Sequence, residues 1–155
     1  MKSLFLPLLV LLSLAANADP LPDCLDNQGQ VLPIDNAQVL EWKSSTQNQF
    51  RARAHVRGTL VKLYHDKNNH KHFGIQIGDN EGETLEVIYE KSFGPLPDLA
   101  PGMIVEACGD YITSSQATSQ YPRSPDDAII HWIHRSNSPH HPSGFVAIND
   151  VAFGT

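Results

Sequence analysis

The sequence has few basic residues. Its 155 residues include 11 Lys and Arg against 17 Asp and Glu, which gives a formal net charge of −6 with histidine neutral. Proteins that bind nucleic acid or anionic membranes without sequence specificity need an excess of Lys and Arg, because contacts with phosphates supply most of that binding energy. The acidic balance therefore disfavours nucleic acid as a ligand and favours a sugar, a peptide or another protein.

The sequence also lacks the short motifs that mark common enzyme and metal sites. It contains no H-E-x-x-H, no C-x-x-C, no G-x-S-x-G and no phosphate-binding loop. Because such motifs carry a nucleophile, a metal ligand or a phosphate cradle at fixed spacing, their absence leaves no specific reaction to assign. The motifs alone therefore do not predict an enzyme or a cofactor.

The only long hydrophobic run lies at the N-terminus. Lys2 is followed by the apolar segment Leu4–Leu14 and then by Ala16-Asn17-Ala18, the order of a signal peptide with its small-residue cleavage site. A run of about 11 residues is too short for a membrane-spanning helix, which needs about 20. We predict a signal peptide of residues 1–18, cleaved after Ala18, and an exported mature chain without a membrane span, periplasmic or extracellular. Loss of Lys2 changes the formal net charge to −7.

Cysteine is scarce, with only Cys24 and Cys108 in the chain. In an oxidising compartment a single pair of cysteines is expected to form one intramolecular disulfide. Closing so long a loop stabilises the folded state by roughly 4 kcal/mol in the chain-entropy model. We therefore predict a Cys24–Cys108 disulfide, with two free buried thiols as the alternative.

The first part of the mature chain predicts little regular structure. Residues 19–49 contain several prolines and a glycine, which favour an extended arm. Asp35-Asn36 can cap a short helix beginning at Ala37, and the polar residues 44–48 end it. We expect an N-terminal arm and one short helix.

From Phe50 onward, apolar and polar residues alternate with the period of β-strands. The expected strands cover residues 50–64, with Gly58 inside, then 70–77, 84–89, 103–111 and 128–134, with a last short strand or hairpin within 144–153. A glycine inside a long first strand suits a sharp bend or bulge. Residues 50–155 therefore predict a mainly β domain, a small OB-like barrel of five to six strands. A β-sandwich is the alternative, disfavoured because sandwiches of this size usually have about seven strands.

The C-terminal part resembles a known pattern. The segment Ile130-His131-Trp132-Ile133-His134, followed by His141-Pro142-x-Gly144-Phe145, is similar to I-H-W-T-H-H-D-P-x-G-x-H-P-x-G-W. That pattern belongs to a bacterial family of small secreted domains of unknown function. Segments 58–61, 70–73 and 101–111 also resemble the family, so the likeness covers roughly residues 51–153.

Two positions depart from the family pattern. Arg135 and Ser136 stand where the family has His-Asp, so a His-Asp pair is missing from this loop, and Phe145 replaces a tryptophan while keeping an apolar side chain. The resemblance implies a secreted OB-like domain, and it brings no established activity with it.

The eight histidines gather in two windows, residues 55–72 and 131–141. Neutral imidazoles bind zinc, copper and nickel, and a catalytic zinc site needs about three protein ligands. His70, His134 and His141 are the candidate ligands of a divalent metal. His131 and His134 are three residues apart and would face opposite sides of a continuous strand, so we interpret His131 as structural.

Three functional hypotheses follow. The first is a binding module that holds a ligand or partner on an exposed face near Tyr111, Trp132, His134 and His141. The second is a metal-dependent hydrolase that uses a metal-bound water at His70, His134 and His141. The third is a structural or stress-related envelope protein without a small ligand.

Overall fold

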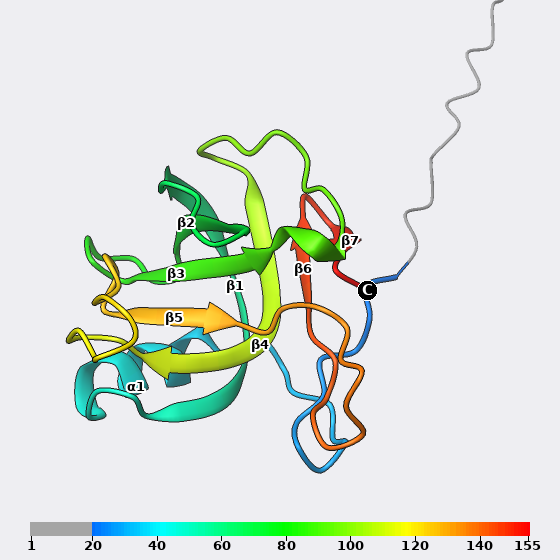
Figure 1. Ribbon diagram of the computed structural model, residues 1–155, viewed down its shortest axis with the longest axis horizontal. Helices are drawn as coiled ribbons and strands as arrows, with labels where there is room; N and C mark the ends of the chain where they lie inside the picture. The colour runs from blue at the N-terminus through cyan, green and yellow to red at the C-terminus, as the bar shows by residue number, and fades with distance from the viewer. Residues whose placement is uncertain (1–19) are drawn as a thin grey trace, which may run out of the picture.

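The computed structural model describes residues 20–155, so the predicted signal peptide lies outside the described residues. No helix in this part of the chain is long and apolar enough to cross a membrane. The elements are α1 (Asn36–Ser45), β1 (Arg51–Leu63), β2 (His70–Gln76), β3 (Thr84–Glu90), the 3₁₀ turn η1 (Lys91–Phe93), β4 (Ile104–Thr113), β5 (Ala128–His131), β6 (Phe145–Ile148) and β7 (Val151–Phe153) (Figure 1).

Five of the strands close into a barrel. The sheet has the order β1-β2-β3-β5-β4-β6-β7, and an additional pairing between β1 and β4 joins the first five strands into a ring. The β3–β5 pairing is parallel and the others are antiparallel. The predicted mainly β barrel with one short helix is confirmed, and the closing β1–β4 pairing excludes the β-sandwich. The hairpin of β6 and β7 extends the sheet beyond the barrel.

β1 is long because it pairs with two neighbouring strands, one after the other. Residues 51–59 pair with β4, and residues 59–63 pair with β2. At the changeover, a Cβ on Gly58 would lie 2.2 Å from the carbonyl oxygen of Gln76, so only glycine fits without a shift of β2. The strand is continuous across Gly58, and the predicted bulge lies just after it, between Leu60 and Lys62.

α1 covers one end of the barrel, the lower end in Figure 1. The Asp35 carboxylate caps the helix by accepting a hydrogen bond of 2.9 Å from the backbone N–H of Gln38. Val39 is buried in the core, and the Trp42 ring lies 5.4 Å from that of Tyr111. Asn36 donates to the carbonyl oxygens of Arg57 and Ile77 and so holds the start of the helix against β1 and the end of β2.

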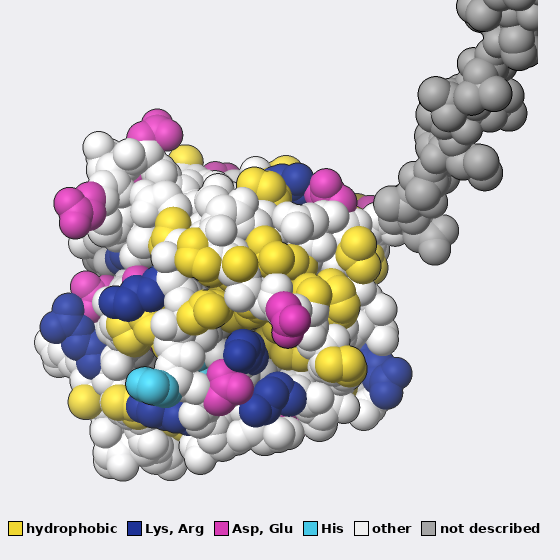
Figure 2. Space-filling model, turned by 90° about the horizontal axis from the view of Figure 1, so that it is seen from above, with side chains coloured by type: hydrophobic (Ala, Val, Ile, Leu, Met, Phe, Trp, Pro, Cys, Tyr) yellow, Lys and Arg dark blue, Asp and Glu magenta, His cyan; other side chains and the backbone are white. Residues whose placement is uncertain are grey.

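The opposite end of the barrel has a different surface. There the connection from η1 to β4 arches over the barrel, and Figure 2 shows hydrophobic side chains gathered in a band across this face. The barrel is therefore capped by a helix at one end and exposes an apolar surface at the other.

Gly58→Ala tests the close approach of β1 and β2. Because the added methyl group would meet a backbone oxygen and not a flexible side chain, we expect the free energy of unfolding to fall by at least about 2 kcal/mol. The measurement is urea unfolding followed by far-UV circular dichroism. Val61→Ala, at an exposed position of the same strand, is the control and should change stability little. Equal stability of Gly58→Ala and the wild type would contradict this packing.

Candidate functional site

β5 ends at His131 because the next residue leaves the extended conformation. Trp132 has φ of 58°, in the left-handed region that bulky side chains rarely adopt. The predicted strand through His134 is therefore too long. The expectation that His131 and His134 face opposite sides of one continuous strand does not apply. Backbone conformations of this kind persist only where the surroundings impose them, and they gather at functional sites.

Glycines let neighbouring segments press directly on this part of the backbone. A Cβ on Gly109 would lie 2.4 Å from the carbonyl oxygen of His131, and a Cβ on Gly144 would lie 2.3 Å from that of Trp132. A third glycine, Gly154, packs against the same segment from the C-terminus. Because β4, the entry to β6 and the chain end all contact it, the backbone around Trp132 is held from three sides.

The chain then makes a compact loop, residues 134–144. The backbone N–H of Gly144 donates to the carbonyl oxygen of His134 at 2.8 Å, so the two ends of the loop lie together. Inside the loop, the backbone N–H of Ser136 donates to the Ser143 hydroxyl oxygen at 3.0 Å. Short loops with adjacent ends and internal hydrogen bonds are frequently functional.

Aromatic rings gather at the start of this loop. Trp132 is 39% exposed, and the centroid of its ring lies 6.0 Å from that of His131, 5.4 Å from His134 and 4.9 Å from His141. The His134 ring stacks on Phe93 with a centroid distance of 3.7 Å and an angle of 13°. We call these five residues the Trp132 rim. Three of them, Trp132, His134 and His141, were predicted from the sequence as ligand-binding residues, and the structure brings them together.

A partly open depression lies at the rim. Besides the rings of Phe93, His131, Trp132 and His134, it is lined by the side chains of Glu90 and Arg135 and by the polar residues 136–138. The surface thus combines flat apolar rings with a carboxylate, a guanidinium, hydroxyl groups and an amide. Such a surface can stack against a ligand and form hydrogen bonds at its edges.

His131 stays neutral at physiological pH. Burial lowers the pKa of its imidazole to about 4, and the nearby His70 and His134 act in the same direction. The ring of His70, on β2, lies 5.4 Å from that of His131. The rim therefore presents His131 as an uncharged group.

The three predicted metal ligands have separate surroundings. His70 donates from Nδ1 to the Asn68 carbonyl oxygen at 2.7 Å, and His134 donates from Nδ1 to the Arg135 carbonyl oxygen at 2.8 Å. His141 donates from Nε2 to Asp110 at 2.8 Å, and its Nδ1 is buried without a hydrogen-bond partner among the described residues. Within residues 20–155, no group of three or more His, Cys, Asp or Glu is placed to hold a metal ion. The geometry adds no support to a metal site at these histidines.

Tyr111 does not reach the rim. Its side chain is fully buried, its ring packs on Trp42, and its hydroxyl lies 3.1 Å from that of Thr113. Two rim residues, Phe93 and His131, were not predicted as ligand-binding. His131 was interpreted as structural because it would face the opposite side of a continuous strand from His134. No sequence pattern links Phe93, which lies in a separate proline-rich connection, to the histidine loop.

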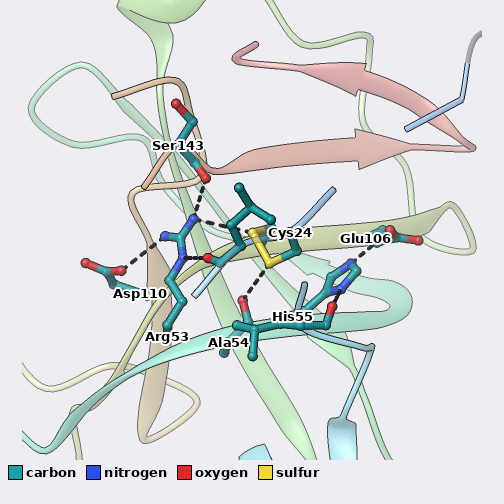
Figure 3. The surroundings of a disulfide bond; sticks show 10 residues. Cys24, Arg53, Ala54, His55, Glu106, Asp110 and Ser143 are labelled. Atoms are coloured by element: carbon teal, nitrogen blue, oxygen red, sulfur yellow. Dashed lines mark hydrogen bonds and ion pairs between the residues drawn. A yellow bond between two sulfur atoms is a disulfide. The ribbon is translucent and has the colours of Figure 1, made fainter. Parts of the chain in front are cut away.

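The predicted disulfide between Cys24 and Cys108 is confirmed, with an S–S distance of 2.03 Å and a Cα–Cα distance of 5.5 Å. It ties the N-terminal arm to β4 on the outside of the barrel (Figure 3). Phe145 and Ala147 of β6 pack against the two cysteines together with Leu21 and Leu32 of the arm. The disulfide therefore lies in a second, small apolar cluster outside the main core.

Arg53 lies beside the disulfide and reaches Asp110 and Ser143 (Figure 3). Its guanidinium donates to the Leu25 carbonyl oxygen at 3.1 Å, to Asp110 at 3.1 Å and to the Cys108 sulfur at 3.4 Å. It also donates to the Ser143 carbonyl oxygen at the end of the 134–144 loop. One buried side chain thus contacts the arm, β4 and the loop.

Comparisons with protein-family models and with curated proteins give no match for this chain. The resemblance to the bacterial family of secreted domains therefore rests on the motif residues alone. The small five-stranded barrel that the resemblance implies is present.

The pKa of His131 can be measured by NMR titration of the imidazole signals. We expect a midpoint near 4, compared with an ordinary value of about 6.5. Between these two values the unfolded chain binds a proton at this position that the folded protein does not bind. Folded-state stability should therefore fall as the pH is lowered through this window.

His131→Gln, which does not titrate, gives the matched comparison. The difference in the free energy of unfolding between this variant and the wild type should change by about 3 kcal/mol from pH 7 to pH 4, since one pKa unit corresponds to about 1.4 kcal/mol. A His131 midpoint at pH 6 or above would contradict the burial of this ring.

Proposed function

We propose that this protein is an exported binding module that holds an extended ligand at the Trp132 rim. The observation that carries the proposal is Trp132 itself, a large apolar side chain kept exposed, in a left-handed backbone conformation, among three histidine rings. A bulky residue in this backbone region costs stability, and such strain gathers at functional sites, which supports a role in recognition.

Export is supported by the disulfide as well as by the N-terminal sequence. A disulfide-bonded domain is consistent with an oxidising compartment, because thiols stay reduced in the cytosol. The site of action that we propose is therefore the periplasm or the cell exterior.

The barrel supports the same role by analogy. We place it with OB-type barrels, which bind oligonucleotides and oligosaccharides on the face of strands two and three. The ring of His70, on β2, lies 5.4 Å from that of His131 in the rim, which supports binding beside that strand.

A saccharide fits the rim better than a peptide or a nucleic acid. The depression is partly open to solvent, which suits a chain lying across it better than a fully enclosed small molecule. Each of the five barrel strands has a partner on both sides, so a peptide cannot add a strand to the barrel itself, and the free edge of the sheet lies at β7. The net negative charge disfavours nucleic acid. An aromatic face with hydrogen-bonding groups at its edges matches the apolar face and hydroxyl edge of a sugar ring.

The two tryptophans allow a direct test. In a Trp42→Phe background, Trp132 is the only tryptophan, so its emission reports on the rim. Residues 19–155 are titrated with cellohexaose, maltohexaose and chitohexaose, with a proline-rich and an acidic peptide, and with single-stranded DNA. We expect a saturable change of emission with at least one hexasaccharide.

Trp132→Ala, followed by calorimetry, should weaken that binding at least tenfold, which corresponds to about 1.4 kcal/mol. Tyr121→Ala is the control, because Tyr121 is a well-exposed aromatic residue outside the rim. Absence of binding across the whole panel, or a Trp132→Ala variant that binds like the Tyr121→Ala control, would refute the proposal. Binding of a peptide or of DNA that requires Trp132 would keep the binding module and overturn the saccharide.

A further inference from the structure

We infer that Arg53 is the positioning residue of the Trp132 rim, and that it makes ligand binding at the rim depend on the Cys24–Cys108 disulfide. Neither cysteine lines the depression, so the disulfide can affect ligand binding only through residues that lie between it and the rim. The inference rests on the proposed function for its effect on binding. Its effect on the rim itself can be measured without any ligand.

Arg53 joins three chain segments that are distant in the sequence. Its side chain is only 4% exposed. The guanidinium donates to Leu25 of the arm, to Cys108 and Asp110 of β4, and to Ser143 of the 134–144 loop. Because the guanidinium is largely desolvated, a donor left without its acceptor costs free energy, and each contact therefore restrains the segment that supplies it.

Asp110 carries this restraint from Arg53 to the rim. One carboxylate oxygen, Oδ1, accepts from Arg53 at 3.1 Å, and the other, Oδ2, accepts from His141 Nε2 at 2.8 Å. The His141 ring lies 4.9 Å from the Trp132 ring. Arg53 therefore acts on the rim by two routes: directly through the Ser143 carbonyl oxygen, and through Asp110 and His141.

The disulfide holds the other side of Arg53. Leu25, whose carbonyl oxygen accepts from Arg53, directly follows Cys24, and Cys108 supplies the sulfur contact. A dithiol reductant would break the S–S bond and convert both cysteines to thiols with two electrons and two protons, while the reductant closes to its own disulfide. The arm would then be held only by non-covalent contacts, and Arg53 would lose its fixed partner at Leu25.

A purely stabilising network and a positioning network predict different results. If Arg53 only stabilised the fold, its loss would lower the melting temperature and leave the folded protein with its normal rim. If Arg53 positions the rim, its loss changes the surroundings of Trp132 at temperatures where circular dichroism shows the barrel to be intact. The rim must therefore be examined well below the melting transition.

The test uses Arg53→Met in the Trp42→Phe background, because methionine keeps part of the apolar stem and removes the guanidinium. We expect a shifted Trp132 emission, at least a twofold increase in acrylamide quenching, and faster amide hydrogen exchange in residues 134–144. Affinity for whichever ligand binds the wild type should fall at least tenfold. Arg123→Met, which removes an exposed ion pair with Asp127, is the control and should change none of these.

Two further variants keep the test decisive if Arg53→Met does not fold. Asp110→Asn weakens the contact with His141 without changing the size of the side chain, and Arg53→Lys keeps the charge without the planar fork. Both should change Trp132 quenching in the same direction as Arg53→Met, and to a smaller extent.

The link to the disulfide is tested with the double variant Cys24→Ala/Cys108→Ala and by treating the wild type with dithiothreitol. Each should reproduce the changes seen at Trp132, and adding Arg53→Met to the double variant should give less than the sum of the separate effects. Folded variants with wild-type emission, quenching and exchange would overturn the inference, whatever their melting temperatures. If these rim readouts change as expected but no ligand of the panel binds, the positioning role stands and the proposed function fails.

Discussion

The antiparallel pairing of β1 with β4 is the constraint on which the rest of the molecule depends. It runs through nine residue pairs, from Arg51 with Ile112 to Thr59 with Ile104, and it closes the barrel. It also builds the outer surface on which the N-terminal arm lies. His55 of β1 donates to the arm at the Leu32 carbonyl oxygen, and β4 carries Cys108, to which the arm is covalently joined. Closure of the core and attachment of the arm thus come from one pair of strands.

The same strand decides where the candidate site lies. β4 pairs with β5 through residues 110–113 and with β6 through residues 105–108, and the change of partner falls at Gly109. The chain therefore has to leave the sheet after His131 and return to it at Phe145, on the same side of β4. The 134–144 loop is part of the connection between His131 and Phe145. Since both of its ends are fixed by one strand, the loop can carry exposed side chains without losing its position.

Patterns that are local in the sequence predicted much of this arrangement. Contacts between segments that are distant in the sequence could not be predicted from such patterns. The period-two alternation predicted the strands, and the cysteine pair predicted the disulfide. Because side chains alternate along a strand, Asp110 and Tyr111 point to opposite faces of β4. The alternation does not tell which face lies inside a barrel, so Tyr111 was placed on the wrong face. The left-handed backbone at Trp132 depends on packing against glycines far away in the sequence. The stacking of Phe93 on His134 likewise has no local signal.

The chemistry open to the rim follows from how its histidine nitrogens are used. A hydrolytic site needs an imidazole nitrogen free to bind a metal or to accept a proton. His141 donates one nitrogen to Asp110 and has the other buried, and His134 donates Nδ1 to the Arg135 carbonyl oxygen. His131 is accessible at the rim, and its lowered pKa makes it a weak base near neutral pH. The histidine rings flank Trp132, and under the proposed function the rim holds its ligand by stacking and hydrogen bonding.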